Sequence, residues 1–406
     1  MIMYIARTIE NDIKEALDFF PILLITGARQ VGKSTLSLKF DQFDYISLDD
    51  TTLFSFAKDD PIGFVSSLKK PIIIDEIQKV PELLSEIKKD IDKNRVNGSY
   101  ILTGSANLLS FKNISDTLAG RIGLFELYPF SMKELYQKDE NVLELFLDDL
   151  SKITLSSIET NTIKEHIING GYPEVQKTKS SKMRYIWFSS YIRTYIERDV
   201  RDIGELRNLE KFIRVFNVLA TRSANILNKS SLAKETQVDV KTLDNYLMLL
   251  EQVYQVFLLR SYQKNMGKEM VKSPKVYFSD SGVLSHTLRI KSVKELDNSH
   301  YKGDIVETFV YAELKKHFNT SEEFFKFNYY RTKDKSEIDF ILENSSHILA
   351  IEVKSSKTAK VDDFKHIIEF DKLVLDKKMV GIVLYFGERV ICFKEKFWAV
   401  PMKVFF

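Results

Sequence analysis

The 406-residue sequence predicts an α/β protein with an N-terminal α/β domain, a central helical region and a second α/β domain at its C-terminal end. Short β-branched segments alternate with helical stretches up to about residue 135. Helical periodicity prevails from about 140 to 275, and strand-like segments return from about 276. We therefore expect domains at 1–140, 141–204, 205–275 and 276–406.

The composition is that of a folded protein and excludes several classes. Hydrophobic residues make up 44% and charged residues 29%, which rules out intrinsic disorder, and the net charge is only +2. The single cysteine, Cys392, excludes a disulfide framework and a cysteine-ligated zinc site, and we expect it to be a small buried hydrophobe. Arg7 and Glu10 come too early for a signal peptide, and no apolar run approaches the roughly 18 residues of a membrane span. We expect a cytoplasmic protein with no membrane partner.

Four short apolar segments are expected to form the strands of the first domain. They are rich in β-branched residues and do not alternate polar with apolar positions, so we expect each to be buried on both faces of a parallel sheet. The segments span residues 21–27, 44–50, 71–76 and 99–105. Helical spacing at 33–40 and 81–93 places helices between them.

Residues 27–35, GARQVGKST, fit the phosphate-binding pattern G-x-x-x-x-G-K-[ST] between an expected strand and an expected helix. Glycines let the backbone N–H groups point at phosphate oxygens, and the helix start adds partial positive charge. Lys33 is expected to reach the β and γ phosphates and Ser34 to ligate Mg²⁺. The expected nucleotide site is Gly27, Ala28, Arg29, Gln30, Val31, Gly32, Lys33, Ser34 and Thr35. A glycine-rich turn before a helix is the plain alternative.

Two acids end the apolar segment PIIIDE at 71–76. We expect Asp75 to hold Mg²⁺ through its water shell, and Glu76 to polarise the water that attacks the γ phosphate. A separate acid in this position indicates a hydrolase. The alternative is that the two acids cap the next helix.

Polar residues at two further points are candidates for the same site. The segment SYILTGS brings Thr103 and Ser105 to a strand end, where they can sense the γ phosphate or position the water, with Asn107 a less favoured candidate. Arg121 follows a helical stretch. It either completes a neighbouring subunit's site in a homo-oligomer or senses the nucleotide in its own, and a plain surface arginine is the third interpretation.

The segments TGARQVGKST, IIIDEIQKVPELL, YILTGSANLL, LAGRIGLFELYPFS, GGYPEV and YIRTYIERDV resemble a bacterial and archaeal family of AAA-type ATPases. The resemblance implies an N-terminal P-loop AAA-type ATPase core followed by a helical lid and a winged helix. It also implies a C-terminal domain similar to the PD-(D/E)XK nuclease superfamily, with a restriction-endonuclease-like fold. ATP as the nucleotide and Mg²⁺ as its metal follow from the resemblance, whereas the substrate does not.

Residues 230–259 have the spacing of a helix-turn-helix, in which Thr242 is a plausible helix cap, and the segment after it is expected to form two strands around a basic turn. Lys and Arg exceed Asp and Glu by 12 to 7 between residues 205 and 275. Contacts to DNA phosphates are expected from Lys241, Arg260, Lys264, Lys268 and Lys272. A purely structural winged helix is weighed equally, and Asp239 and Asp244 speak against deep groove binding.

The C-terminal domain carries an acid pattern on two expected strands. Glu352 and Lys354 are two residues apart and share a face of one strand, and Asp339 lies on the strand before it. We expect Asp339 and Glu352 to bind Mg²⁺ with Glu307 of a preceding helix as a further ligand. Lys354 would orient the water or offset phosphate charge. A solvated sheet face with ion pairs is the alternative.

Together these features predict an ATP-hydrolysing AAA-type ATPase that acts on DNA and carries a Mg²⁺-dependent nuclease-like domain. The competing hypothesis is a nucleotide-dependent switch or scaffold. In that hypothesis the winged-helix and nuclease-like domains bind a partner and cut nothing.

Overall fold

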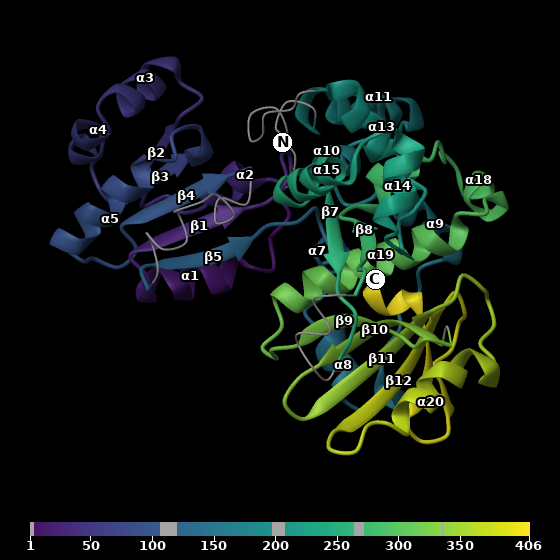
Figure 1. Ribbon diagram of the computed structural model, residues 1–406. Coiled ribbons are helices and arrows are strands. Elements are labelled where there is room, and N and C mark those ends of the chain that lie inside the picture. The colour runs from purple at the N-terminus through teal and green to yellow at the C-terminus, as the bar shows by residue number, and fades with distance from the viewer. Residues whose placement is uncertain (1–3, 106–119, 197–207, 264–271, 335) are drawn as a thin grey trace. The chain divides into compact units, whose positions relative to one another are not determined.

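The computed structural model describes residues 4–105, 120–196, 208–263, 272–334 and 336–406, and the chain divides into two compact units (Figure 1). The N-terminal unit holds residues 1–130 and the short stretch 252–255, and the second unit holds nearly all of the rest. The four predicted domains are a finer division than this, and their boundaries stay predictions.

A five-stranded, wholly parallel sheet forms the centre of the N-terminal unit, with the order β2-β3-β4-β1-β5. Its strands are β1 (Ile22–Thr26), β2 (Asp44–Ser47), β3 (Ile72–Asp75), β4 (Tyr100–Gly104) and β5 (Ile122–Glu126). The predicted α/β class is confirmed, and β1, β3 and β4 are buried along their whole length. The prediction of burial on both faces is wrong for β2, because β2 is an edge strand whose residues stay half or fully exposed.

Helices connect these strands and cover the sheet (Figure 1). They are α1 (Glu10–Phe19), α2 (Lys33–Ser37), α3 (Thr51–Asp59), α4 (Pro61–Ser67), η1 (Ile77–Lys79) and α5 (Leu83–Lys93). Leu84, Ile87 and Ile91 recur at helical spacing on α5 and are buried in the core beneath the sheet. That packing fixes the strands whose carboxyl ends carry the nucleotide motif.

The second unit begins with a helical stretch, as the loss of strand pattern after about residue 140 predicts. Its elements are α7 (Met132–Leu135), α8 (Val142–Leu147), η3 (Leu150–Lys152), α9 (Thr160–Asn169), α10 (Pro173–Gln176), α11 (Ser181–Tyr191) and η4 (Ile192–Ile196). Three further helices lie between the two sheets of this unit in the chain: α17 (Ser281–Thr287), α18 (Val293–Asn298) and α19 (Lys302–Asn319).

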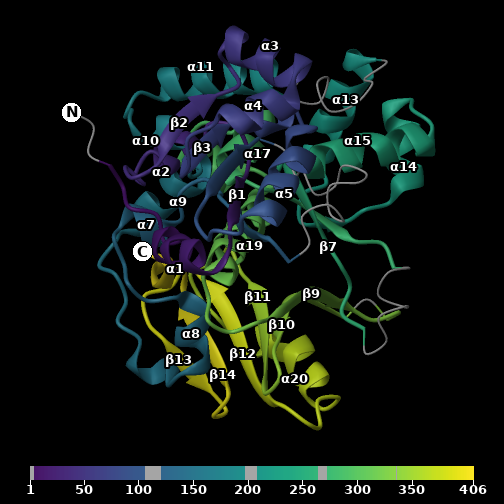
Figure 2. The same cartoon turned by 90° about the vertical axis from the view of Figure 1, so that its left-hand side faces the viewer.

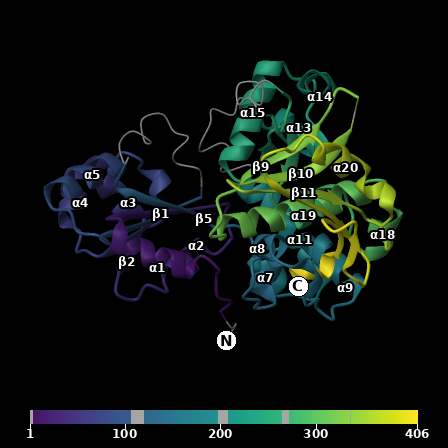
Figure 3. The same cartoon turned by 90° about the horizontal axis from the view of Figure 1, so that it is seen from below.

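A small three-stranded antiparallel sheet with the order β6-β8-β7 follows in the chain. Its elements come in the order α13 (Leu209–Ala220), β6 (Asn225–Ile226), α14 (Lys229–Thr236), α15 (Val240–Gln252), β7 (Val256–Leu259) and β8 (Lys275–Phe278). The helices α13, α14 and α15 lie together in Figure 3 as they do in Figure 1. The central strand of this sheet is β8.

A six-stranded mixed sheet with the order β13-β14-β12-β11-β10-β9 forms the C-terminal part (Figure 2). Its elements are β9 (Lys326–Arg331), β10 (Glu337–Glu343), β11 (His347–Val353), η5 (Val361–Phe364), α20 (Lys365–Asp371), β12 (Lys378–Tyr385), β13 (Ile391–Phe393), β14 (Phe397–Pro401) and η6 (Met402–Phe405). Ile367 and Phe370 of α20 pack against one face, and Tyr311 of α19 meets Phe340. Cys392 lies exposed on β13, so its predicted burial is wrong.

The described helices include none whose length and apolar content would let it cross a membrane.

Candidate functional site

The phosphate-binding motif forms the turn between β1 and α2. Gly27 has φ +147°, and a Cβ there would lie 2.1 Å from the Leu127 carbonyl oxygen. Gly32 has φ +100° and directly precedes α2. Because both positions need backbone geometry that L side chains rarely adopt, the two glycines of the motif are structural requirements of this turn.

The Lys33 side chain lies inside this turn. It is only 7% exposed, and its ammonium donates hydrogen bonds of 2.9 Å to the carbonyl oxygens of Gly27 and Ala28. Arg7 supports the loop by donating to the Val31 carbonyl at 2.8 Å. Sequence reasoning missed Arg7, since nothing in a lone arginine before the first helix indicates such a contact.

Asp75 ends β3 next to the motif and accepts hydrogen bonds from three hydroxyl groups. The Ser34 hydroxyl donates to its carboxylate at 2.8 Å and the Tyr45 hydroxyl at 2.7 Å. Thr103, at the end of β4, donates to the other carboxylate oxygen. The structure thus brings together Ser34, Asp75 and Thr103, whereas Tyr45 was not predicted.

Tyr45 lies on the edge strand β2, which pairs with β3. Burial and the Asp75 carboxylate raise the pKa of Tyr45, so its hydroxyl stays protonated and donates. A tyrosine on the strand next to an acid-bearing strand is the only sequence signal that could have indicated this contact.

Glu76 follows Asp75 in the left-handed region, at φ 59°. This conformation is uncommon outside glycine. The Arg29 guanidinium of the phosphate loop lies 3.9 Å from its carboxylate. Gln78 donates to Glu76 and also to the Ser105 hydroxyl, the latter at 3.0 Å, so Gln78 is a second contact that the motif did not indicate.

Arg121 lies at the opposite end of the sheet from the phosphate loop. It directly precedes β5, whose first residue is level with the first residue of β1, whereas the phosphate loop follows the last residue of β1. A strand of five residues separates the two ends of the sheet by roughly 15 Å. The arginine pairs with Asp92 of α5 at 2.6 Å. This position corrects the prediction that Arg121 senses the nucleotide of its own subunit; Asn107 lies outside the described residues.

A magnesium ion fits the residues at the end of β3. The nearby oxygen ligands are a hydroxyl and a carboxylate, which suit this hard cation. Asp75 is buried, and the side chains of the described residues that donate to it are neutral hydroxyl groups. Its negative charge is therefore left for a cation.

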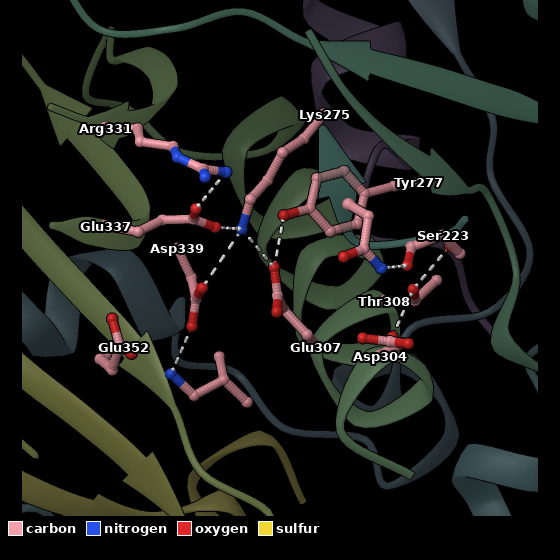
Figure 4. Close-up of polar contacts among 12 residues, drawn as sticks. Ser223, Lys275, Tyr277, Asp304, Glu307, Thr308, Arg331, Glu337, Asp339 and Glu352 are labelled. Carbon is pink, nitrogen blue, oxygen red and sulfur yellow. Dashed lines mark hydrogen bonds and ion pairs between the residues drawn. The ribbon is translucent and has the colours of Figure 1, made fainter. Parts of the chain in front are cut away.

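A second group of acids lies in the C-terminal part, and we call Glu307, Glu337, Asp339 and Glu352 the acidic centre (Figure 4). Lys275 of β8 projects into it with 1% of its surface exposed. Its ammonium lies 3.0 Å from Glu307, 2.6 Å from Glu337 and 3.3 Å from Asp339. Sequence reasoning missed Lys275, because it is 64 residues from Asp339 and was counted among the basic residues of the winged helix.

The strands β10 and β11 bring Asp339 and Glu352 together as predicted. Phe340 and Ile351 are directly paired, so Asp339 and Glu352 are opposite each other one position further along. The Val353 N–H donates to Asp339 at 2.9 Å. Lys354 donates to one oxygen of Glu352 at 2.7 Å, and the other oxygen is buried with no hydrogen-bond partner among the described residues.

The carboxyl groups of this centre have shifted pKa values. Burial, followed by the charge of Asp339, raises the pKa of Glu307 to about 8 and that of Glu352 to about 8. Burial alone would lower the pKa of Lys275, but the carboxylates around it, Glu307 foremost, raise its pKa well above the ordinary value. Lys275 is therefore charged at neutral pH.

The predicted metal set of Glu307, Asp339 and Glu352 is corrected by these contacts. Within the described ranges, no three His, Cys, Asp or Glu side chains gather as a group that could hold a metal ion. The Lys275 ammonium lies between Glu307 and Asp339. The Lys354 ammonium forms an ion pair with Glu352.

Three family models match successive parts of the chain. Residues 20–136 match the AAA domain, residues 160–294 a domain of unknown function (DUF8612), and residues 302–405 another domain of unknown function (DUF4143). Together with the parallel sheet and the phosphate loop, the first match supports an AAA-type P-loop ATPase domain in the N-terminal unit.

Curated relatives cover nearly the whole chain. An uncharacterized protein of Mycobacterium tuberculosis is 26% identical over 396 residues, which is 96% of this chain and 82% of the relative. One from Methanocaldococcus jannaschii is 25% identical over 398 residues, or 93% and 84% of the two chains.

Two solved structures are similar over a large part of the chain. The Walker-type ATPase of Pyrococcus abyssi is 16% identical, with a TM-score of 0.43 over 69% of this chain and 94% of that one. The Orc1 protein of Aeropyrum pernix in complex with DNA is 13% identical, with a TM-score of 0.27 over 71% and 93%.

Proposed function

We propose that this protein hydrolyses ATP with Mg²⁺ in its N-terminal unit and uses the second unit to bind DNA. The observation that carries the first part is the meeting of Ser34 and Thr103 on the Asp75 carboxylate beside the phosphate loop. The acid that we expect to bind the metal, a loop hydroxyl and a strand-end hydroxyl meet at one point, which supports ATP hydrolysis at this site.

Different residues of the site bind the phosphates, hold the metal and activate the water. Backbone N–H groups of the loop bind the phosphates, and Lys33 exchanges its carbonyl partners for phosphate oxygens. Ser34 and Asp75 would hold Mg²⁺, which supplies charge neutralisation on the phosphates. Glu76 accepts the proton of the attacking water or polarises it, while Gln78 orients the Glu76 carboxylate relative to Ser105.

Arg121 is a candidate for a contact in trans. Its place at the far end of the sheet separates it from its own phosphate loop, and a contact with a neighbouring copy would compete with its ion pair to Asp92. If it acts in this way, the protein is a homo-oligomer, and mixing Arg121→Ala subunits with Glu76→Gln subunits will restore part of the ATP turnover. No recovery in the mixture would make Arg121 a structural residue.

The order of elements from α13 to β8 supports a winged helix in the second unit. Two helices, α14 and α15, follow one another as in a helix-turn-helix, and β7 and β8 form the hairpin of a wing. Among the basic residues expected to bind phosphates, Lys241 lies in the first turn of α15. Arg260 directly follows β7 and Lys272 lies three residues before β8, so both belong to the connection between these strands. Lys264 and Lys268 lie outside the described residues.

Asp239 and Asp244, the two acids expected to disfavour DNA binding, each contact a nearby residue. Asp239 caps α15 by accepting from the Thr242 N–H at 2.8 Å, so Asp239 takes the capping role predicted for Thr242. Asp244 pairs with Lys229 at 2.6 Å. The Lys229 ammonium offsets the charge of Asp244, so this acid repels a phosphate less than a bare carboxylate would. Asp239 has neutral donors and keeps its negative charge.

The C-terminal part supports a nuclease-like fold. Its core runs α19-β9-β10-β11-α20-β12, with three antiparallel strands followed by a helix and a parallel strand. One observation favours the second hypothesis, that this domain binds without cutting. The lysine inside the acidic centre occupies the space between carboxylates that a metal would need.

ATP turnover measured with and without duplex DNA tests the proposal. We expect Mg²⁺-dependent hydrolysis that DNA alters, and a loss on the order of 100-fold in Asp75→Asn. The variant Asp44→Asn, an exposed acid at the start of β2, is the control. Equal turnover by Asp75→Asn and wild type would remove this strand end as the ATP site.

Fluorescence anisotropy of a labelled duplex tests the DNA part. Lys241→Glu should weaken binding about tenfold and reduce the salt dependence by about one phosphate contact. Lys294→Glu on α18 carries the same charge change outside the α13–β8 segment and serves as the control. Equal weakening by both variants would indicate a diffuse charge effect and would contradict a winged-helix contact.

A further inference from the structure

Lys275 is placed in the acidic centre by a rigid part of the fold. It is the first residue of β8, the central strand of the small sheet, and pairs with Ile226 on one side and Leu259 on the other. Two residues further, Tyr277 lies on the same face of β8 and donates to Glu307 at 2.6 Å. The Tyr277 ring also stacks on Tyr311 of α19, with centroids 4.2 Å apart.

These contacts fix the position of Lys275 more strictly than a surface loop would fix a lysine. A lysine on a surface loop can withdraw its ammonium by rotating its side chain. Lys275 starts from a strand that is hydrogen-bonded on both sides, and its stem is 1% exposed. Its charge therefore has no path to water without separation of β8 from α19.

The charges in the centre are nearly balanced without any metal. The four carboxyl groups meet three cations: Lys275 between Glu307, Glu337 and Asp339, Arg331 at 3.2 Å from Glu337, and Lys354 at 2.7 Å from Glu352. One carboxylate is in excess. Burial and the charge of Asp339 raise the pKa values of Glu307 and Glu352, which favours a protonated carboxyl group in the centre at neutral pH.

We propose that the Lys275 ammonium is the resident cation of the acidic centre, and that the centre binds no divalent metal while Lys275 is present. The C-terminal part then retains the shape and the acids of a nuclease-like domain but lacks its metal. This inference rests on the second unit alone and is independent of ATP hydrolysis in the first.

Removing the lysine should create the metal site. In Lys275→Met, Glu307, Glu337 and Asp339 lose their common cation. Their carboxylates would then move toward the vacated point, where they supply the charge and the oxygen chemistry that a divalent cation selects. Mn²⁺ should then replace the ammonium.

The test is Mn²⁺ binding to the nucleotide-free full chain, followed by electron paramagnetic resonance and by the melting temperature. We expect the acidic centre of the wild-type protein to bind no Mn²⁺, so Asp339→Asn should leave Mn²⁺ binding unchanged. Lys275→Met should melt roughly 10 °C lower than wild type, bind one equivalent of Mn²⁺ and regain most of the lost melting temperature with it. The double variant Lys275→Met/Asp339→Asn should lose that gain.

Lys164→Met is the matched control. Lys164 is also a buried lysine, 6% exposed, and pairs with Asp297 at 2.7 Å. Its removal should cost stability but create no Mn²⁺ site, because Asp297 is a lone, partly exposed acid that retains Lys302.

Two results would overturn the proposal. The first is a wild-type Mn²⁺ site that Asp339→Asn abolishes, which shows that a metal binds beside Lys275. The second is a folded Lys275→Met that binds no Mn²⁺, which shows that the lysine does not stand in for a cation. Should Lys275→Met fail to fold, the comparison of wild type with Asp339→Asn decides the question alone.

Discussion

The two strand regions that carry acids have similar sequence patterns, but the groups that contact the acid are neutral in one region and positively charged in the other. Asp75 and Asp339 both follow apolar residues on a buried strand, and both have a polar partner on a neighbouring strand. Asp75 accepts hydrogen bonds from the hydroxyl groups of Ser34, Tyr45 and Thr103, which carry no charge. Asp339 faces the ammonium of Lys275.

This difference shows that a metal site depends on what else surrounds the carboxylate. A hydroxyl group orients a carboxylate and leaves its negative charge for a cation. An ammonium group within 3.3 Å cancels that charge and occupies the space. The same acid pattern can therefore be a metal site at one strand end and an internal ion-pair network at another.

The largest effect on ATP hydrolysis is expected for Lys33 of the first region, whereas Lys354 of the second region should have almost none. Lys33→Ala should lower ATP hydrolysis on the order of 1000-fold and abolish nucleotide binding, because no other side chain in the phosphate loop places an ammonium inside the turn. Lys354→Ala should leave hydrolysis near the wild-type level. Nucleotide titration and steady-state turnover of both variants check this, and a substantial loss in Lys354→Ala would break the separation.

A smaller kinetic effect is expected for the acid that prepares the water. Glu76→Gln should retain ATP binding and lose turnover by about 100-fold or more, since the amide cannot accept a proton. Glu82→Gln, an exposed acid six residues further along the chain, is the control and should behave as wild type. Unchanged turnover in Glu76→Gln would transfer the role of base to the strand end at Thr103 and Ser105.

The comparison is sharpened by removing one charge from each centre and measuring stability. Asp339→Asn should destabilise the second unit by about 1–3 kcal/mol, because Lys275 loses one of its three carboxylates in a buried place. Asp75→Asn should cost less, since its partners are neutral hydroxyl groups. Urea unfolding followed for each unit measures both, and the reverse order would contradict the charge assignment.

A further effect on stability is a pH dependence of the second unit. Glu307 and Glu352 have pKa values near 8 in the folded state, above the ordinary value of a glutamate. Between about pH 5 and 8 the folded state therefore holds a proton that the unfolded state has lost, and stability falls as the pH rises. Urea midpoints at pH 5.5 and 8 should show this fall. A midpoint that stays constant or rises with pH would contradict the raised pKa values of the two glutamates.

Much of the first region follows from local sequence. The strands around residues 22–26, 72–75 and 100–104 are continuous apolar runs, and the glycines of the phosphate loop have spacing that only one turn geometry satisfies. The exposure of β2 was not predictable in this way, because its position at the sheet edge depends on strand order rather than on its own residues.

The second region shows what local patterns leave out. Register places Asp339 opposite Glu352, and period-two alternation places Glu352 and Lys354 on one face, so these contacts were predictable. Lys275 comes from another sheet, 64 residues before Asp339, and its charge looked like part of a basic wing. Only tertiary packing of β8 against α19 brings it among the acids.

The most direct test of the account maps metal positions on the intact protein. Fe²⁺ substitutes for Mg²⁺, and with ascorbate and peroxide it generates hydroxyl radicals that cut the backbone beside each bound metal. In the presence of ATP, we predict cuts near Ser34 and Asp75 and none near Asp339 and Glu352, with new cuts there in Lys275→Met. Cuts beside Asp339 in the wild-type protein, or none beside Asp75, would contradict the central claim.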